Sequence, residues 1–275
     1  MATPERILDL DRLAARIPDG ASLAVPAEYG GVPMALTRAL LARATRGLRL
    51  IGCPTTGLQA DLLIGAGRVA EIETAAVMLG ELGPAPRFRA AVTAGTLRIK
   101  DATCPAIHSG LQAAEKGIPF LPIRGILGSD LLRHRPDWKV IDNPYAAGDP
   151  IVLVPAIQPD VAVFHAPLAD RRGNVWIGVR RELMTMAHAA RHALVTVEEI
   201  VEDDLLEDAR MAPGTIPHVY VTAVAEAKNG AWPLPLAGRY GPDEAHLRLY
   251  AEGARSAEGF QRYLDRYVLA QTAAE

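Results

Sequence analysis

The sequence predicts an α/β protein whose sheet is largely parallel and flanked by helices. Three observations support this fold class: short apolar and β-branched runs, longer segments of helical spacing between them, and glycine turns at the junctions. The first unit is a buried run at 22–25, a glycine turn, a helical segment from 33 to about 45 and an apolar run at 48–51. A strand, a helix and a strand in this order join two parallel strands with a nearly fixed handedness.

The same alternation continues along the chain. An opening helix is predicted at 4–17, where apolar residues recur at helical spacing before a turn at Asp19-Gly20. The stretch 125–150 is rich in Pro, Gly and Asp, so we expect a long excursion over the surface or over a site. Further helices are expected at 105–116, within 243–269, and in a segment that begins at 61–63 and ends near 65–67. Further strands are expected at 69–77, 97–100, 120–122, 151–154, 161–164, 194–197 and 219–224.

Composition and charge restrict the classes of function. The chain has 275 residues, of which 49% are hydrophobic and 22% charged, as in globular proteins that bury a full core. Lys and Arg total 29 and Asp and Glu total 32, which gives a formal net charge of −3. This balance excludes a general nucleic-acid binder, because such a protein needs a surplus or a stripe of basic residues.

Cysteine usage and hydropathy predict a cytoplasmic location. Cys53 and Cys104 are the only cysteines and lie far apart, so they build neither a disulfide scaffold nor a structural zinc site. The first twenty residues lack the apolar core of a signal peptide, and the longest aliphatic run, 151–157, is too short to span a bilayer. We therefore expect no membrane segment.

The loop after the first predicted strand is the first candidate site. Glu28, Tyr29, Gly30 and Gly31 precede a helix that begins at Pro33. Adjacent glycines at this junction let a ligand approach the backbone and direct N–H groups at an anion or a developing oxyanion. A tight turn that needs glycine only for its backbone angles explains the same residues.

A second candidate site lies where the strand at 97–100 meets the next helix. Asp101, Thr103, Cys104 and His108 place a carboxylate, a hydroxyl, a thiol and an imidazole near one helix N-terminus. A thiolate at this position would be stabilised by the helix dipole. The alternative is an N-cap by Thr103 or Asp101 beside a buried cysteine.

Three further patterns favour structural roles. His188 and His192 lie four residues apart, but no glutamate completes an HExxH motif and no third ligand is evident, so no metal is expected. The seven carboxylates between 198 and 208 are expected to form a solvated acidic face. The Gly-Ala-Gly at 65–67 follows a helical segment and is expected to end it.

Residues 156–174, AIQPDVAVFHAPLADRRGN, closely resemble the signature of family I coenzyme A transferase α-chains. In that signature a strand ending in His-Ala leads to Ala-Asp-x-x-Gly-Asn. The last of four further similar stretches resembles the Gly-Ala-x-Pro tail of glutaconate CoA-transferase A-chains. Because the resemblance spans nearly the whole chain, we expect 1–275 to be a single domain of this type. The four stretches are 28–36, 62–69, 110–122 and 229–240.

The resemblance implies a CoA-transferase fold shared with sugar-phosphate isomerases, namely glucosamine-phosphate and ribose-phosphate isomerases. It also implies that coenzyme A is a substrate and that a partner β-subunit carries the catalytic glutamate, which makes the protein a hetero-oligomer. In the family, that carboxylate attacks an acyl-CoA, a glutamyl-CoA thioester forms, and a second small organic acid takes the CoA. The chain is therefore expected to be inactive without its partner.

The family pattern also assigns the two candidate sites. By the resemblance, the loop 28–31 and the segment 101–104 are expected to shape the acyl site and to help hold the oxyanion. Related α-chains of the ketoacid type differ in the first loop, where they carry Gly-Gly-Phe-Gly. Those chains also carry Gln near the position of Cys104. By this match we expect catalytic roles for Gly30, Gly31, Asp101 and Cys104, and substrate or CoA binding by Glu28, Tyr29, Thr103 and His108.

Two other functions are open. The α-chains of two-chain steroid-ring hydrolases, which open a carbon–carbon bond in a CoA thioester, also resemble this sequence, notably at 110–124. In such an enzyme Asp101 would act as a base. The remaining alternative is a non-catalytic chain that binds an acyl-CoA. The partner separates the three, because a transferase partner carries the nucleophilic glutamate, a hydrolase partner lacks it, and a sensor has no partner.

Overall fold

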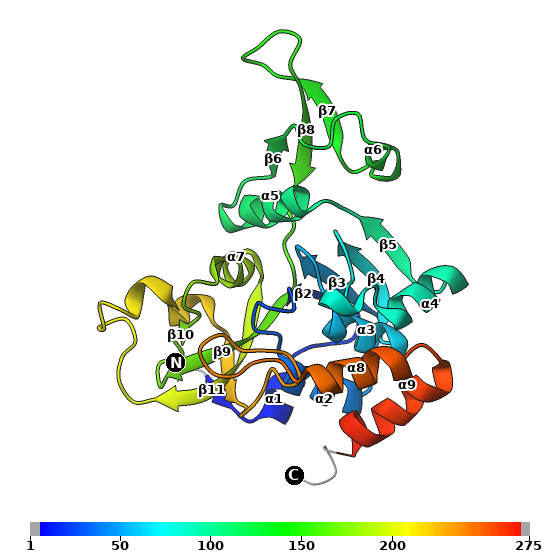
Figure 1. Ribbon diagram of the computed structural model, residues 1–275. Helices are drawn as coiled ribbons and strands as arrows, with labels where there is room; N and C mark the ends of the chain where they lie inside the picture. Colours follow the sequence, from blue (N-terminus) through cyan, green and yellow to red (C-terminus); the bar gives the residue numbers. More distant parts are fainter. Residues whose placement is uncertain (1–5, 271–275) are drawn as a thin grey trace.

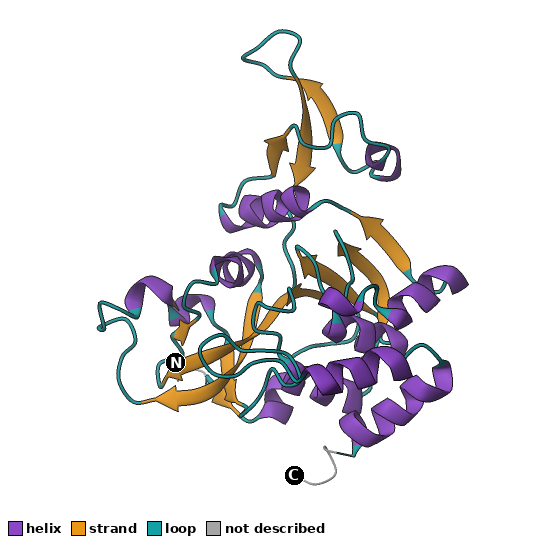
Figure 2. Ribbon diagram, in the orientation of Figure 1, coloured by secondary structure: helices purple, strands orange, loops and turns teal. Residues whose placement is uncertain are grey.

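The computed structural model describes residues 6–270 and shows a mostly parallel sheet with helices on both faces (Figures 1 and 2). All neighbours along its main path pair in parallel, which confirms the predicted α/β fold class. Two short strands lie off this path: β10 (Val175–Trp176) pairs antiparallel with β9, and β12 (Thr215–Ile216) pairs antiparallel with β10. The main path runs β1 (Ile7–Leu8), β13 (Ala223–Glu226), β11 (His192–Val201), β9 (Val161–Asp170), β2 (Ser22–Pro26), β3 (Leu48–Cys53), β4 (Val69–Thr74) and β5 (Arg98–Asp101).

The helices lie between and after these strands. Side chains cap several of them; the Asp9 carboxylate accepts from the N–H of Arg12 at 2.7 Å at the start of the first. None of the described helices is long and apolar enough to cross a membrane. They are α1 (Leu10–Ala14), α2 (Met34–Ala42), α3 (Leu58–Gly65), α4 (Pro86–Ala94), α5 (Cys104–Glu115), α6 (Leu131–His134), α7 (Arg181–Ala189), α8 (Glu244–Gly253) and α9 (Ala257–Leu264), with a π-helical turn over Asp265–Leu269.

Two hydrophobic cores lie on the two faces of the sheet. Leu23 and Val25 of β2 belong to the core shared with α2, α3, α8 and α9, whereas Ala24 between them belongs to the core shared with α5 and α7. Successive side chains of a strand point to opposite faces, so a strand covered on both sides is apolar throughout. This double burial explains why the central strands were recognisable as short apolar runs.

The runs at 120–122 and 151–154 are strands, but their expected place in the parallel sheet is wrong. They belong to a second, antiparallel sheet in the order β6 (Phe120–Ile123), β8 (Pro150–Pro155) and β7 (Lys139–Asp142), which projects from the body at the top of Figure 1. Only one face of β8 is fully buried, with Val152 and Val154 in the same apolar cluster as Trp138. Because the residues of its other face are apolar as well, the run resembled a doubly covered strand in the sequence.

Other element boundaries also differ from expectation. Of the helix predicted at 4–17, residues 4 and 5 lie outside the described residues, and Ile7–Leu8 form β1 because they pair with β13. The strand expected at 69–77 ends at Thr74, and residues 218–220 form a 3₁₀ turn before β13. The helix α4 was not predicted, and it has no buried residue from which an apolar stripe would be recognised.

The projecting part, residues 120–155, is attached to the main sheet through a buried ion pair. The Arg135 guanidinium donates to the carboxylates of Glu73 on β4 at 2.6 Å and Asp137 at 2.8 Å. It also donates to the carbonyl of Asp101 at 3.0 Å and lies over the ring of Trp138. Because the side chains of Arg135 and Glu73 are only 3% and 9% exposed, neither charge has much access to water.

Replacing this arginine tests the attachment. Arg135→Met should lower the free energy of unfolding by about 1 to 3 kcal/mol, because it leaves the buried Glu73 carboxylate with only its ion pair to the half-buried Lys100. Urea denaturation measures the loss. Arg133→Met is the matched control: its ion pair with Asp130 joins side chains that are 82% and 83% exposed, so it should change nothing measurable. Equal effects of the two variants would contradict the assignment.

Candidate functional site

The strand order reverses between β2 and β9. On one side of this point β3, β4 and β5 follow β2 along the sheet, and on the other side β11 and β13 follow β9. In open α/β sheets, ligands bind outside the carboxyl ends of the strands at such a reversal. The loop 27–33, which leaves the carboxyl end of β2, lies at this point.

Gly31 of this loop approaches the neighbouring strand more closely than any other residue type allows. Gly31 has a φ of +78°, and a Cβ at this position would overlap the carbonyl oxygen of His165 on β9. The carbonyl of Gly31 accepts from the N–H of His165 at 2.7 Å, and the N–H of Gly30 donates to the carbonyl of Ala27 at 2.7 Å. Within residues 6–270, the N–H of Gly31 donates to no acceptor.

A pocket of about 240 Å³ lies beside this loop. Its wall combines Tyr29, Gly30 and Gly31 with residues from the end of β9, the segment 176–183 and the segment 236–238. Most of these are apolar side chains or glycines, and Arg180 is the charged residue among them. The Arg180 guanidinium lies 5.0 Å from the centre of the Tyr29 ring. The structure therefore places three of the predicted site residues on one pocket wall.

Glu28 is directed away from this pocket, towards the N-terminus of α3. Its carboxylate accepts from the N–H of Leu58 at 2.6 Å. Burial raises the pKa of Glu28 to about 7; the hydrogen bond from Leu58 opposes this rise and the nearby Asp61 carboxylate adds to it. Near neutral pH, the Glu28 carboxyl group is therefore partly protonated and partly ionised. Its hydrogen bond from Leu58 joins the loop to α3.

A buried polar network lies beneath the loop. The His165 ring, fully buried on β9, hydrogen-bonds the Thr196 hydroxyl at 2.8 Å and the Glu198 carboxylate at 2.7 Å. Glu198 also accepts from the Tyr240 hydroxyl at 2.6 Å and from the N–H of Asn229 at 2.8 Å. Burial alone would raise the pKa of Glu198, but these hydrogen bonds outweigh it and hold the pKa at about 2.

Glu198 was expected on a solvated acidic face, and for this residue that expectation is wrong. It lies within β11, directly after the predicted apolar run 194–197, and shares a strand face with Thr196, two residues before it. Thr196 is the register partner of His165 on β9. Strand alternation was therefore the available signal, hidden by the other carboxylates that follow. Arg171 and Arg172 pair with Glu202 and Asp204 in that acidic stretch.

The second candidate segment lies at the same edge of the sheet but not at the same pocket. Asp101 ends β5 and is exposed, Thr103 caps α5 by accepting from the N–H of Ala106 at 3.3 Å, and Cys104 is exposed at the first helical position. His108 is half-buried one turn later. Strands β3 and β4 separate β5 from β2, so about 14 Å of sheet lies between the two segments.

The turn within the stretch 156–174 is structural. The Asp170 carboxylate is buried and accepts hydrogen bonds from the N–H groups of Arg172 and Asn174 at 2.9 and 3.0 Å, from the Asn174 side chain at 2.7 Å and from the N–H of Leu205 at 3.1 Å. These bonds fix the reversal between β9 and β10. β10 in turn places Trp176 on the pocket wall.

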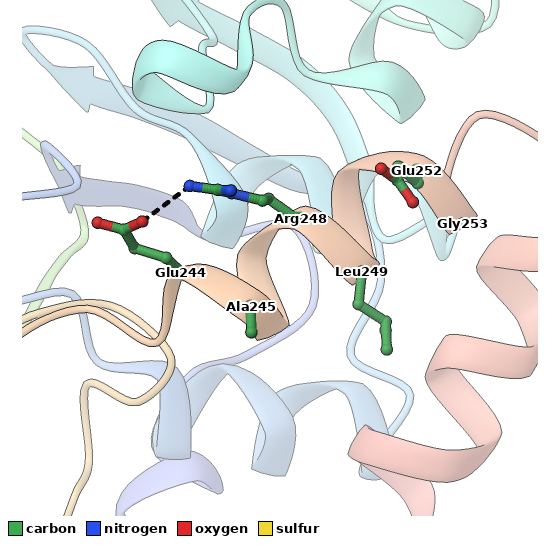
Figure 3. A pocket seen from close by; sticks show the side chains of 6 residues that line it. All are labelled: Glu244, Ala245, Arg248, Leu249, Glu252 and Gly253. Carbon is green, nitrogen blue, oxygen red and sulfur yellow. Dashed lines mark hydrogen bonds and ion pairs between the residues drawn. The ribbon is translucent and has the colours of Figure 1, made fainter.

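The hollow along α8 and the pair His188 and His192 offer no comparable arrangement. The hollow has a volume of about 820 Å³. Figure 3 shows that its lining side chains all come from this helix, where Glu244 pairs with Arg248 at 2.8 Å. His188 lies in the last turn of α7 and hydrogen-bonds Glu115, whereas His192 begins β11. Among residues 6–270, no group of three or more His, Cys, Asp or Glu side chains is arranged to hold a metal ion.

The comparison with protein families agrees with this geometry. The model of the coenzyme A transferase family matches residues 7–227. This chain belongs to the coenzyme A transferase family. The resemblance inferred from the motifs is thereby confirmed.

Curated relatives of different activity match to similar degrees. One subunit of the glutaconate CoA-transferase of Acidaminococcus fermentans is 35% identical over 76% of this chain and 70% of that protein. The cholesterol ring-cleaving hydrolase IpdA subunit of Rhodococcus jostii is 34% identical over 86% of this chain and 82% of that protein. The chain spans 53% of an Archaeoglobus fulgidus protein, with 33% identity.

The solved structure of glutaconate coenzyme A-transferase from Acidaminococcus fermentans superposes with a TM-score of 0.88 at 29% identity. The match covers 96% of this chain and 89% of the other. This similarity extends over almost the whole described fold. It confirms a fold of the CoA-transferase type.

Substitutions at two glycines of similar φ test the close approach of the loop. Gly31→Ala should destabilise the protein by about 1 to 3 kcal/mol more than Gly20→Ala, because of the two only a Cβ at Gly31 would overlap a backbone carbonyl oxygen. Gly20 has a φ of +76° and open space around it. Urea denaturation compares the two. In the assembled complex, Gly31→Val should abolish turnover, and unchanged turnover would refute a role for this loop.

The pKa of Glu28 predicts a pH-dependent stability. The folded pKa of about 7 exceeds the ordinary 4.5, so between these values the folded state binds more protons than the unfolded state. The free energy of unfolding should therefore fall as pH rises through this window, by at most about 3 kcal/mol. Glu28→Gln should remove this fall, whereas Glu81→Gln, at an exposed carboxylate nearby, should keep it. Parallel pH profiles of wild type and Glu28→Gln would contradict the assignment.

Proposed function

We propose that this chain is the α subunit of a heteromeric cytoplasmic CoA-transferase. It moves CoA from an acyl-CoA to a small organic acid through a glutamyl-CoA thioester on a partner β-subunit. Membership of the family supports the type of reaction, and the relative that is one subunit of a glutaconate CoA-transferase supports the subunit role. The chain supplies one wall of the acyl site, and coenzyme A enters as a substrate.

The observation that carries this proposal is the position of the Gly31 N–H. It belongs to a residue on the pocket wall, at the carboxyl end of β2, and has no acceptor within residues 6–270. A backbone donor held in place before the reaction begins is the device that stabilises the oxyanion of acyl transfer. The N–H of Gly30, by contrast, is engaged by Ala27. Of the two glycines, Gly31 is therefore the proposed donor.

The reaction proceeds in covalent steps of acyl transfer. The partner glutamate attacks the thioester carbonyl, the carbon–sulfur bond breaks, and a mixed anhydride and CoA thiolate result. The thiolate then attacks the glutamyl carbonyl, which releases the first acid as a carboxylate and leaves the glutamyl-CoA thioester. A second carboxylate repeats these steps in reverse and leaves with CoA. Each attack places negative charge on a carbonyl oxygen, where the Gly31 N–H donates.

A CoA-thioester ring-opening hydrolase is the second candidate. The hydrolase subunit of Rhodococcus jostii matches this chain about as well as the transferase subunit does. Asp101, exposed at the end of β5, is the base in this alternative. It lies beside the N-terminus of α5, and about 14 Å of sheet separates it from the glycine loop. A hydrolase would thus use the second segment, and a transferase the first.

The assembled complex distinguishes these functions. We expect purification from the native cells to yield a second chain, and incubation with acyl-CoA followed by borohydride to reduce one of its glutamates. Reduction traps a glutamyl thioester as an alcohol that mass spectrometry locates. Asp101→Asn is expected to leave the rate of CoA transfer within about fivefold, since a change below 1 kcal/mol in the barrier does no more. Hydrolytic cleavage of a ring carbon–carbon bond in a cyclic acyl-CoA, with the thioester intact, no trapped glutamate and the activity lost in Asp101→Asn, would favour the hydrolase. A chain without any partner would contradict both.

A further inference from the structure

The pocket beside the glycine loop has a single charged group in an otherwise apolar wall. Of its lining residues, four are glycines, eight carry apolar side chains, and the remaining two are Tyr29 and Arg180. The carboxylate of Glu182 lies near this guanidinium but makes no hydrogen bond to it, and a cation in an apolar wall is stabilised by an anion that does. The composition of the wall therefore indicates a ligand with an apolar body and one negative end.

The Arg180 guanidinium has hydrogen-bonding capacity that the protein leaves unused. Its Nε is buried and donates to no acceptor among the described residues. Its nearest carboxylate, that of Glu182, lies 3.7 Å from a terminal nitrogen, which is too long for a hydrogen bond. The contact with the Tyr29 ring orients the guanidinium without using its N–H groups. Buried donors without partners are rare in folded proteins and mark a position that a ligand completes.

The size of the pocket restricts that ligand. Its volume of about 240 Å³ is below the roughly 300 to 1,000 Å³ of pockets that enclose drug-sized molecules. The nucleotide of coenzyme A is therefore excluded, and a short acyl chain fits. Gly31 lies on the same wall, so an acid in the pocket presents one end to the loop and the other to Arg180.

We propose that Arg180 binds the second carboxylate of the substrate, so that the acid this chain selects is a short dicarboxylic acid. The proposal rests on the transferase function above. One carboxyl group exchanges CoA beside Gly31, the methylene groups lie against the apolar wall, and the other carboxylate accepts two hydrogen bonds from the guanidinium. A lysine would not replace this planar pair of donors. Arg180 is then a specificity-determining residue.

The test compares two acids of five carbons, glutarate and pentanoate, on the assembled complex. Calorimetric titration measures binding, and acyl-CoA formation measures CoA transfer. Arg180→Met should raise the Kd and KM for glutarate about 10- to 100-fold and change those for pentanoate less than about twofold. Arg180→Lys should recover part of the glutarate affinity. Arg181→Met and Arg181→Lys are the matched controls, because Arg181 is exposed on α7 and does not line the pocket.

Each outcome decides the question. Equal binding of the two acids by the wild type, or equal losses of binding for both acids in Arg180→Met, would overturn the proposal. In either case, CoA transfer to pentanoate would still support the transferase function. Glutarate binding that depends on Arg180, without CoA transfer to either acid, would support the carboxylate site and overturn the transferase. If Arg180→Met fails to fold, Arg180→Lys against Arg181→Lys gives the same comparison, and a glutarate Kd unchanged by Arg180→Lys would overturn the proposal.

Discussion

The contact between the backbones of Gly31 and His165 is the constraint on which the candidate site depends. The loop from β2 lies so close to β9 that the residue at position 31 has no room for a Cβ. A hydrogen bond of 2.7 Å from the N–H of His165 to the carbonyl of Gly31 joins the two segments. This contact closes the point where the strand order reverses. The loop therefore becomes a rigid wall of the pocket, with its remaining N–H held in a fixed direction.

The His165 side chain extends this constraint into the core. Through Glu198 it reaches Tyr240, so hydrogen bonds join β9, β11 and the segment 229–240. Glu198 is ionised at neutral pH, and a buried charge of this kind is tolerated because its oxygens accept several hydrogen bonds. Part of the same C-terminal segment, Leu236 to Gly238, lines the pocket. The glycine loop and the segment 236–238, two parts of the pocket wall, are thus held by one connected network.

Most of the main sheet and the glycine loop were predictable from the sequence, whereas the projection and much of the site were not. Doubly buried strands such as β2 leave unbroken apolar runs, and a glycine pair after a strand is a local signal. Arg180 carries no local signal, because its role depends on a pocket that distant segments build. Glu198 was hidden among other acidic residues. The separation of Asp101 from Gly31 follows from strand order, which no short motif encodes.

The buried turn around Asp170 has a consequence for assigning reactions within a family. Its carboxylate is occupied by N–H groups of its own neighbourhood, so the turn contributes to the scaffold and takes no direct part in chemistry. Substitutions that change the pocket and substitutions that change this turn therefore fall on different residues. A chain can exchange one reaction for another while its most recognisable motif stays unchanged. The motif therefore identifies the family, whereas the residues around the pocket determine the reaction.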